Sequence, residues 1–321
     1  MLVKEETFER LAQIPNLSIS QDVLLSRCTR FGIGGPAHIY AETSDQHAFI
    51  AALDVARASG VKYEVIGGGT NLIVADAGFR GLVLRFTADS IHHEGTRVRV
   101  AAGAVLQTLV DYCVDRGLKG LETMTGIPGS VGAALYGNAG AYGHSIEEIT
   151  ETVRFYDGTE IRILVNSECE FAYRESAFKR HKDWIIFSAD LQMQTAPAEE
   201  LRRTADDILA IRNQKYPPTM KCAGSIFKNL ILKNLAEPVR RAVPEKVTRE
   251  GKVPSAWFLE QVGAKGMKIG DIHGADYHAN LIYNVNNGTA LQLCQVIQEL
   301  KSRVQRQFGL ELEEEVQYVG F

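Results

Sequence analysis

The order of hydrophobic and polar positions predicts short strands and amphipathic helices along the whole chain. Apolar residues recur at helical spacing over Asp45–Ala58, Val105–Arg116, Ala198–Asn213 and Thr289–Phe308. Ser44 precedes the first of these helices, as an N-cap residue does. Apolar or alternating runs predict strands at His38–Ala41, Tyr63–Ile66, Leu82–Phe86, Arg97–Ala101, Trp184–Met193, Asn280–Val285 and Leu310–Val319. Because helices and strands are interspersed, we expect an α+β fold.

A hairpin and a final strand are the most distinctive alternating segments. Asp157-Gly158 separates runs at Thr152–Tyr156 and Glu160–Val165, which predicts a hairpin with a two-residue type I′ turn. In the last strand, alternation places apolar and acidic side chains on opposite faces. The apolar face would hold Leu312, Val316 and Tyr318, and the acidic face Glu311, Glu313 and Glu315.

Length, charge and cysteine content limit the class of protein. A chain of 321 residues predicts two or three lobes. The formal net charge of −4 does not favour a general role on nucleic acid or on a membrane surface. The N-terminus carries acids where a signal peptide would be basic, and no apolar run reaches the roughly 18 residues of a membrane span. Five scattered cysteines fit free thiols in a reducing cytoplasm.

Two glycine-rich stretches have the character of phosphate-binding loops. Gly126–Gly143 holds no charged side chain, and Ser130 is placed to cap a short helix over Val131–Tyr136. Free N–H groups at such a helix start bind phosphate well. The strand at Tyr63–Ile66 runs directly into a second glycine turn, Gly67–Asn71. We therefore expect two loops that accept a diphosphate.

These glycine-rich stretches have two alternative interpretations. The first is a tightly packed structural loop, because glycine-rich patterns match many unrelated segments. The second is a nicotinamide-binding Rossmann dehydrogenase with the fingerprint G-x-G-x-x-G. The spacing disfavours it, since Gly126, Gly129 and Gly132 recur every three residues and Gly67–Leu72 is spaced wrongly as well.

Three polar residues are candidates for chemistry. Arg174 follows the hairpin, and a guanidinium beside a glycine-lined site holds a carboxylate through paired bonds; the alternative is an exposed arginine. Ser225 follows small residues, and its hydroxyl can deliver a proton; the alternative is a loop serine that caps a turn. Glu315 would act as a general acid if it faced a cleft; the alternative is a solvated strand face.

One acidic and histidine-rich segment has the composition of a metal site. Its spacing matches no standard zinc pattern, so we expect no metal ion there. The residues concerned are Asp271, His273, Asp276 and His278.

With these motifs assembled, the chain resembles the UDP-N-acetylenolpyruvoylglucosamine reductase family from about Thr29 to Val319. Each motif is weak alone, but six in family order with compatible spacing form a specific signal. They are TRFGIGGPA at 29–37, GGGTNLIV at 67–74, GIPGSVGAALYGNAGAYG at 126–143, YRESAF at 173–178, AGSIFKN at 223–229 and LEEEVQYV at 312–319.

The resemblance implies a two-lobed FAD-binding domain of the vanillyl-alcohol-oxidase-like (PCMH) type and a C-terminal α+β substrate domain. The implied parts are 1–86, joined by the returning strand 310–321, then 87–200, and a substrate domain at 201–309. FAD would contact Gly67, Gly68, Gly69, Thr70, Asn71, Gly126, Gly129, Ser130, Gly132, Asn138, Gly140 and Ala141. The nucleotide-sugar would contact Tyr173, Arg212, Lys215 and Asn229.

The resemblance also implies a reaction in two halves. NADPH would reduce FAD and leave, and UDP-N-acetylglucosamine enolpyruvate would then receive the hydride, which yields UDP-N-acetylmuramate for peptidoglycan. Arg174 and Glu315 would stabilise the developing negative charge, and Ser225 would protonate the adjacent carbon. The implied enzyme is cytoplasmic, binds no nucleic acid and is compatible with a monomer.

Three departures from the family pattern matter. Ala133, Leu230 and Glu314 stand where the family often has glycine, proline and proline, and Glu314 leaves the register of the acidic run open. The short interval between Arg174 and Arg212 indicates the subtype without a tyrosine-bearing insertion, so no closing tyrosine is assigned. Two other functions stay open, a different FAD oxidoreductase or oxidase of the same superfamily and a non-catalytic flavin- or nucleotide-binding module.

Overall fold

The computed structural model describes residues 2–321, and the chain divides into two compact units. Unit 1 comprises the residues up to Val23, Ala37–Gly68 and Arg80–Gln214. Unit 2 comprises Leu24–Pro36, Gly69–Phe79 and Lys215–Phe321. Each unit has its own hydrophobic core.

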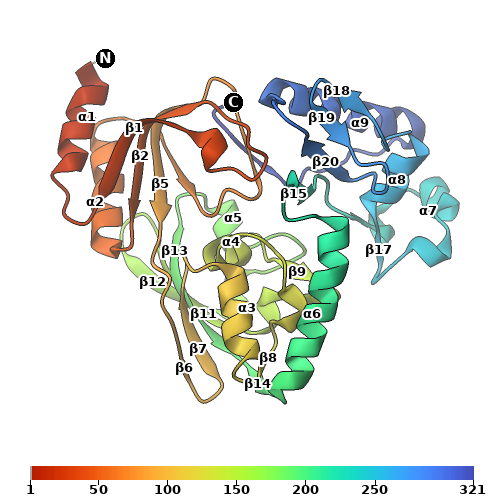
Figure 1. Ribbon diagram of the computed structural model, residues 1–321, viewed down its shortest axis with the longest axis horizontal. Coiled ribbons are helices and arrows are strands. Elements are labelled where there is room, and N and C mark those ends of the chain that lie inside the picture. The colour runs from red at the N-terminus through yellow and green to blue at the C-terminus, as the bar shows by residue number, and fades with distance from the viewer. Residues whose placement is uncertain (1) are drawn as a thin grey trace. The chain divides into compact units, whose positions relative to one another are not determined.

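In the first sheet of unit 1, strand β3 leads into the glycine turn that begins at Gly67. The order of the sheet is β1-β2-β5-β3, and β3 runs parallel to β5. Figure 1 shows α1 and α2 on one side of these strands. The bounds are α1 (Leu2–Ala12), β1 (Ser18–Leu24), β2 (Pro36–Thr43), α2 (Gln46–Ala58), β3 (Tyr63–Ile66) and β5 (Phe79–Phe86).

The second sheet of unit 1 is antiparallel, in the order β12-β11-β13-β7-β6. Its strands are β6 (Ile91–Glu94), β7 (Arg97–Ala101), β11 (Thr150–Tyr156), β12 (Ile161–Val165) and β13 (Ile185–Gln192). Beside it lie α3 (Leu106–Val114), α4 (Val131–Tyr136), α5 (Ala177–Arg180) and α6 (Ala198–Lys215). Short strands complete the unit: β8 (Leu118–Lys119), β9 (Gly140–Ala141), β10 (His144–Ser145) and β14 (Gln194–Thr195).

Aromatic packing joins the two sheets of unit 1 in one core. The ring centroid of Phe49 on α2 lies 5.8 Å from that of Phe86 on β5 and 5.7 Å from that of Phe187 on β13. Phe86 and Phe187 are 4.9 Å apart, and all three pairs have edge-to-face geometry. The turns that carry the candidate residues of this unit are therefore supported by a continuous apolar interior.

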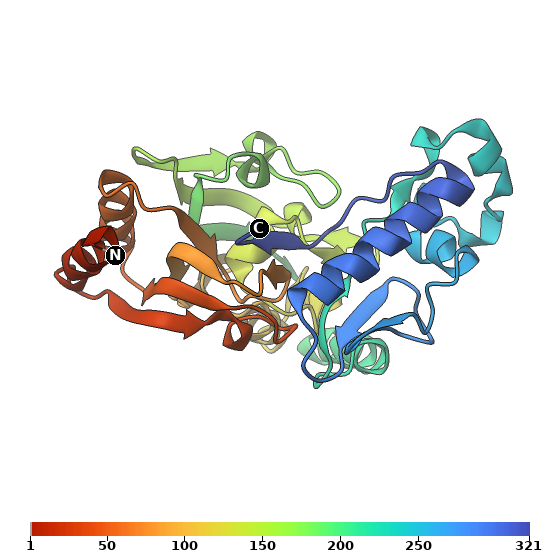
Figure 2. The same cartoon turned by 90° about the horizontal axis from the view of Figure 1, so that it is seen from above.

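Unit 2 is built on an antiparallel sheet in the order β15-β20-β19-β18. The long helix α9, blue in Figure 2, packs against β18 and β19. A parallel pair of β4 and β21 brings the end of the chain beside residues 72–74. The bounds are β4 (Leu72–Val74), β15 (Lys221–Ser225), β16 (Leu230–Ile231), α7 (Glu237–Ala242), β17 (Lys252–Val253), α8 (Ser255–Gln261), β18 (Lys268–Ile269), β19 (Ile272–Gly274), β20 (Leu281–Asn284), α9 (Ala290–Phe308) and β21 (Gln317–Val319).

The mixed α+β fold is confirmed, and Ser130 does cap α4 through Ala133 N, at 3.3 Å. Two local predictions are wrong. The cap of α2 is Asp45 rather than Ser44, because its Oδ1 accepts from His47 N at 2.7 Å. The 157–160 loop of the hairpin has four residues rather than two, because Tyr156 pairs with Ile161.

The final segment also differs from its prediction. Regular pairing is confined to β21, and Leu312 and Val316 are buried, whereas Tyr318 is 40% exposed. Strict alternation therefore fails, because residues 310–316 of unit 2 form only an isolated bridge, between Glu314 and Phe227, and no regular strand. Within residues 2–321, no helix has both the length and the apolar character that a membrane crossing requires.

Candidate functional site

In unit 1, Gly67 and Gly68 pack directly on residues 129–130 of the other glycine-rich stretch. A Cβ atom on Gly67 would lie 2.8 Å from Ser130 Oγ, and one on Gly68 would lie 3.2 Å from Gly129 Cα. A side chain at either position would therefore push the loops apart. The small residues that composition singled out are required here by close backbone approach.

The donors of α4 are already used, so one part of the phosphate prediction is wrong. Val131 N donates to Ala104 O at 2.9 Å and Gly132 N donates to Ala102 O at 2.8 Å. Ala133 N is capped by Ser130. Within residues 2–321, by contrast, the backbone N–H groups of Gly67–Gly69 have no protein acceptor. These donors fit an anionic group such as a diphosphate.

The Asn138 side chain has a second feature that suits a bound ligand. Its side chain is 3% exposed, and its backbone φ of +42° is in the left-handed region. Its Nδ2 atom donates to Ala172 O at 2.9 Å and to a carboxylate oxygen of Glu147. Its Oδ1 atom is buried without a hydrogen-bond partner among the described residues. A buried acceptor of this kind is satisfied by a ligand N–H, which a flavin ring can provide.

Arg174 is tied to the same loop. Its Nη2 donates to Gly140 O at 3.0 Å and its Nη1 to Asn138 O at 3.4 Å. Its φ of +59° is strained for a residue with a long side chain, and Lys179 Nζ holds its carbonyl at 2.9 Å. The half-buried side chain is thus fixed beside the glycine-rich stretch and is not a solvated surface arginine. The Tyr173 ring lies beside it, 5.4 Å from the guanidinium carbon.

Ser225 and Glu315 lie close together in unit 2. Glu315 N donates to Ile226 O at 2.7 Å, so Glu315 lies across from the residue that follows Ser225. Asn71, at the end of the Gly67–Asn71 turn, donates through Nδ2 to Glu315 O at 2.9 Å. Ser225 and Glu315, which are 90 positions apart in the sequence, therefore lie on neighbouring segments.

The structure also separates the acidic residues that the sequence left equivalent. Lys228 pairs with Glu313, and Lys301 Nζ lies 3.0 Å from Glu314 Oε1. Glu311 is exposed. Glu314 and Glu315 are both half-buried, and Glu315 is the one whose backbone N–H bonds to Ile226, next to Ser225.

The predicted sugar-binding residues occupy distinct surroundings. Arg212 lies under the left-handed turn at Gly126, where an added Cβ would be 3.1 Å from its Nε. Lys215 precedes Tyr216, whose ring centroid is 5.1 Å from Lys215 Nζ. Asn229 Oδ1 accepts from Ser255 N at 3.3 Å, so this side chain also supports the start of α8.

Tyr216 is a candidate that the sequence did not identify. Its hydroxyl lies 3.3 Å from Ser225 Oγ. The local pattern does not predict this contact. The chain turns at Pro217-Pro218 between the two residues, and the path of that turn is not encoded in their spacing.

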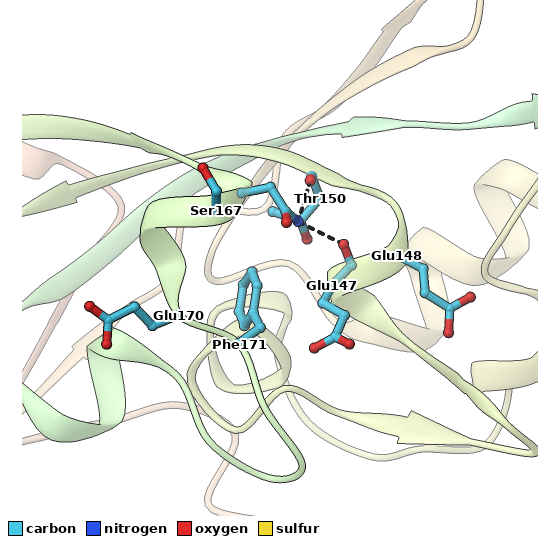
Figure 3. A pocket seen from close by; sticks show the side chains of 7 residues that line it. Glu147, Glu148, Thr150, Ser167, Glu170 and Phe171 are labelled. Atoms are coloured by element: carbon cyan, nitrogen blue, oxygen red, sulfur yellow. Dashed lines mark hydrogen bonds between the residues drawn. The ribbon is translucent and has the colours of Figure 1, made fainter. Parts of the chain in front are cut away.

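An acidic hollow of about 490 Å³ lies elsewhere on unit 1 (Figure 3). None of its lining residues is a predicted site residue, and its carboxylates would repel a diphosphate. Among residues 2–321, no group of three or more His, Cys, Asp or Glu side chains is arranged for a metal ion. The lining residues are Glu147, Glu148, Thr150, Asn166, Ser167, Glu170 and Phe171.

Comparison with known proteins gives a consistent result. A family model described as an FAD binding domain matches residues 37–163, and one for the C-terminal domain of UDP-N-acetylenolpyruvoylglucosamine reductase matches residues 216–319. The reductase of that name from Solibacter usitatus (strain Ellin6076) is 65% identical over 97% of this chain and 100% of its own length. Its counterpart from Bacillus subtilis (strain 168) is 32% identical over 92% of each.

A solved structure is similar as well. The crystal structure of UDP-N-acetylenolpyruvylglucosamine reductase from Thermus caldophilus matches with a TM-score of 0.74 and 27% identity. The match covers 94% of this chain and 99% of the solved chain.

Proposed function

The chain belongs to the UDP-N-acetylenolpyruvoylglucosamine reductase family, and from that premise we propose which of its residues carry the reaction. It is an FAD-dependent oxidoreductase of peptidoglycan precursor synthesis, with NADPH and a UDP-sugar as its substrates. The substrate is UDP-N-acetylglucosamine enolpyruvate and the product is UDP-N-acetylmuramate.

The residues of the glycine-rich stretches fit FAD. The unsatisfied N–H groups of Gly67–Gly69 would hold its diphosphate, and the buried Oδ1 of Asn138 would accept from the flavin ring. The other predicted contacts are Thr70, Asn71, Gly126, Gly129, Ser130, Gly132, Gly140 and Ala141. Bound FAD would supply the redox chemistry, which is hydride transfer between NADPH and the enolpyruvyl alkene.

The protein then handles charge and a proton. Arg174, held by the carbonyls of Asn138 and Gly140, stabilises the negative charge that builds on the substrate carboxylate and the neighbouring carbon. Glu315 acts beside Arg174 in stabilising the charge at that carbon. Ser225 donates its hydroxyl proton to the carbon. Tyr173, Arg212, Lys215 and Asn229 orient the nucleotide-sugar.

The observation that supports these roles most is the 2.7 Å hydrogen bond from Glu315 N to Ile226 O, which joins the Ser225 and Glu315 segments. The test is Ser225→Ala in anaerobic rapid mixing. NADPH should bleach the flavin band at the wild-type rate, whereas the sugar should restore it about 10²–10⁴-fold more slowly, the scale of a lost general acid.

Ser90→Ala, at an exposed serine, is the matched control and should change neither step. Restoration of the band at the wild-type rate in Ser225→Ala would remove Ser225 from the mechanism. A flavin that NADPH does not bleach would instead favour an oxidase or a binding module.

The chain has three functional parts in this proposal, at 1–86 with 310–321, at 87–200 and at 201–309. A cytoplasmic location is supported by five free cysteines, and burial raises the pKa of Cys113 and Cys169 to about 12. A monomer that binds no nucleic acid completes the proposal.

A further inference from the structure

A serine that donates its proton must recover one before the next turnover. An alkoxide is a strong base, so transfer from Ser225 is easier if a second donor supplies a proton as the first one leaves. A phenol is a stronger acid than an alcohol, which makes a tyrosine hydroxyl a suitable second donor. This reasoning rests on the proposed role of Ser225.

Tyr216 is placed to act in that way. It follows the end of α6, and its hydroxyl lies 3.3 Å from Ser225 Oγ. Ser225 pairs with Leu281 across the sheet, and Gly224 before it has a φ of +78° that turns the backbone. Both side chains are half-buried, so the contact is partly shielded while solvent can still reach the tyrosine.

A lysine and a histidine lie beside the Tyr216 ring. Lys215 Nζ lies 5.1 Å from the ring centroid, and its positive charge stabilises a negative charge on the ring system. The His278 ring centroid lies 6.4 Å away. Burial, together with the Lys215 charge, lowers the pKa of His278 to about 4, so this imidazole is neutral near pH 7. Tyr277 donates to Lys215 O at 2.9 Å and holds the segment in place.

We infer that Tyr216 returns the proton to Ser225 during sugar reduction. The Ser225 O–H bond breaks as a C–H bond forms on the substrate. The Tyr216 O–H bond breaks as the Ser225 O–H bond re-forms, and a proton from water restores the phenol. Tyr216 acts through Ser225 and is therefore a positioning and proton-supplying residue.

The test is Tyr216→Phe, with flavin reduction and flavin reoxidation measured separately. Reduction by NADPH should keep its wild-type rate, and reoxidation by the sugar should slow about tenfold or more. The deciding readout is the reoxidation rate in mixtures of H₂O and D₂O. Two protons in motion give the wild-type enzyme a curved dependence on the deuterium fraction, and one proton should give Tyr216→Phe a straight line.

Tyr277→Phe is the matched control, because it removes another tyrosine hydroxyl that touches the Lys215–Tyr216 segment but not Ser225. It should leave reoxidation within about twofold of the wild type and keep the curvature. Equal slowing in both variants would mean that loosening of the segment explains the effect, and would overturn the inference. Curvature that persists in Tyr216→Phe would also overturn it.

Ser225→Ala separates this inference from the proposed function. If Ser225→Ala reoxidises at the wild-type rate, the proton-donor assignment fails and the relay fails with it. If Ser225→Ala is slow while Tyr216→Phe is normal, only the relay is wrong. If both are slow, the double variant should be no slower than Ser225→Ala, because Tyr216 acts only through that serine.

Discussion

The glycine-rich loops of unit 1 and the Ser225 segment of unit 2 are built by different means. In unit 1 the requirement is small size, and contacts such as Gly67 with Ser130 leave no room for a Cβ atom. In unit 2 the requirement is a set of distant partners. Phe227 N donates to Asn280 Oδ1 at 2.9 Å, and Ser255 Oγ donates to Phe227 O at 3.2 Å.

The difference explains which contacts could be predicted from local composition. A backbone that must approach another closely appears directly as glycine and alanine. A strand held by residues 28 and 53 positions away has no local signature. A close approach of two backbones therefore shows in composition, whereas the position of the Ser225 segment depends on long-range hydrogen bonds.

The largest expected effect is on the polar network of unit 2. Asn280→Ala should lower the free energy of unfolding by about 3 kcal/mol, because it leaves the buried Phe227 N–H without its acceptor and opens a small cavity. Denaturant unfolding measures this change. Asn213→Ala, at an exposed position, should have almost no effect, and equal losses in the two variants would contradict the account.

Gly67→Ala tests the corresponding feature of unit 1. The added Cβ would lie 2.8 Å from Ser130 Oγ, so the variant should lose about 2 kcal/mol of stability and bind FAD more weakly. Thermal unfolding and FAD titration measure the two effects. Gly137→Ala is the control, because its nearest contact would be 3.5 Å away. A stable Gly67→Ala variant with normal FAD affinity would show that close approach is not required.

Lowering the pH should reduce the stability of unit 2, because His278 becomes protonated on unfolding. Its folded pKa of about 4 lies below the ordinary value of 6.5, so the unfolded state binds more protons between these values. Stability should fall as the pH drops from about 6.5 to 4, by roughly 1.5 kcal/mol after allowance for the half-exposed ring. His278→Gln should flatten this part of the pH profile, whereas exposed His92→Gln should leave it unchanged. An identical slope in both variants would exclude His278 as the cause.

The smallest expected effect is on the N-terminal cap of α9, which involves only neighbouring residues. Thr289 caps α9, and its Oγ1 accepts from Gln292 N at 3.2 Å. Thr289→Ala should lower the free energy of unfolding by about 1 kcal/mol, and Thr289→Ser should retain most of the stability. Denaturant titration of both variants would detect the difference, and a loss in Thr289→Ser equal to that of alanine would contradict the capping role.

Local patterns predicted much of the fold. The strand at Tyr63–Ile66 and the helix at Val131–Tyr136 have the predicted bounds, because their apolar spacing and cap are complete within a few residues. The same reasoning failed at α2, where the carboxylate of Asp45 bonds the helix N–H groups in place of the neighbouring serine. It failed again in the last segment, where contacts with Ile226 and Phe227 override alternation.

Local sequence specified the glycine turns, the caps and the apolar periods, because each depends on the size or hydrogen bonding of adjacent residues. The same motifs, taken in order, indicated the family. Tertiary structure decided that Glu315, of the acidic run, pairs with Ile226 next to Ser225, and that Tyr216 reaches Ser225. These choices depend on which backbone groups of distant segments pair, and that pairing is set by burial of the whole unit.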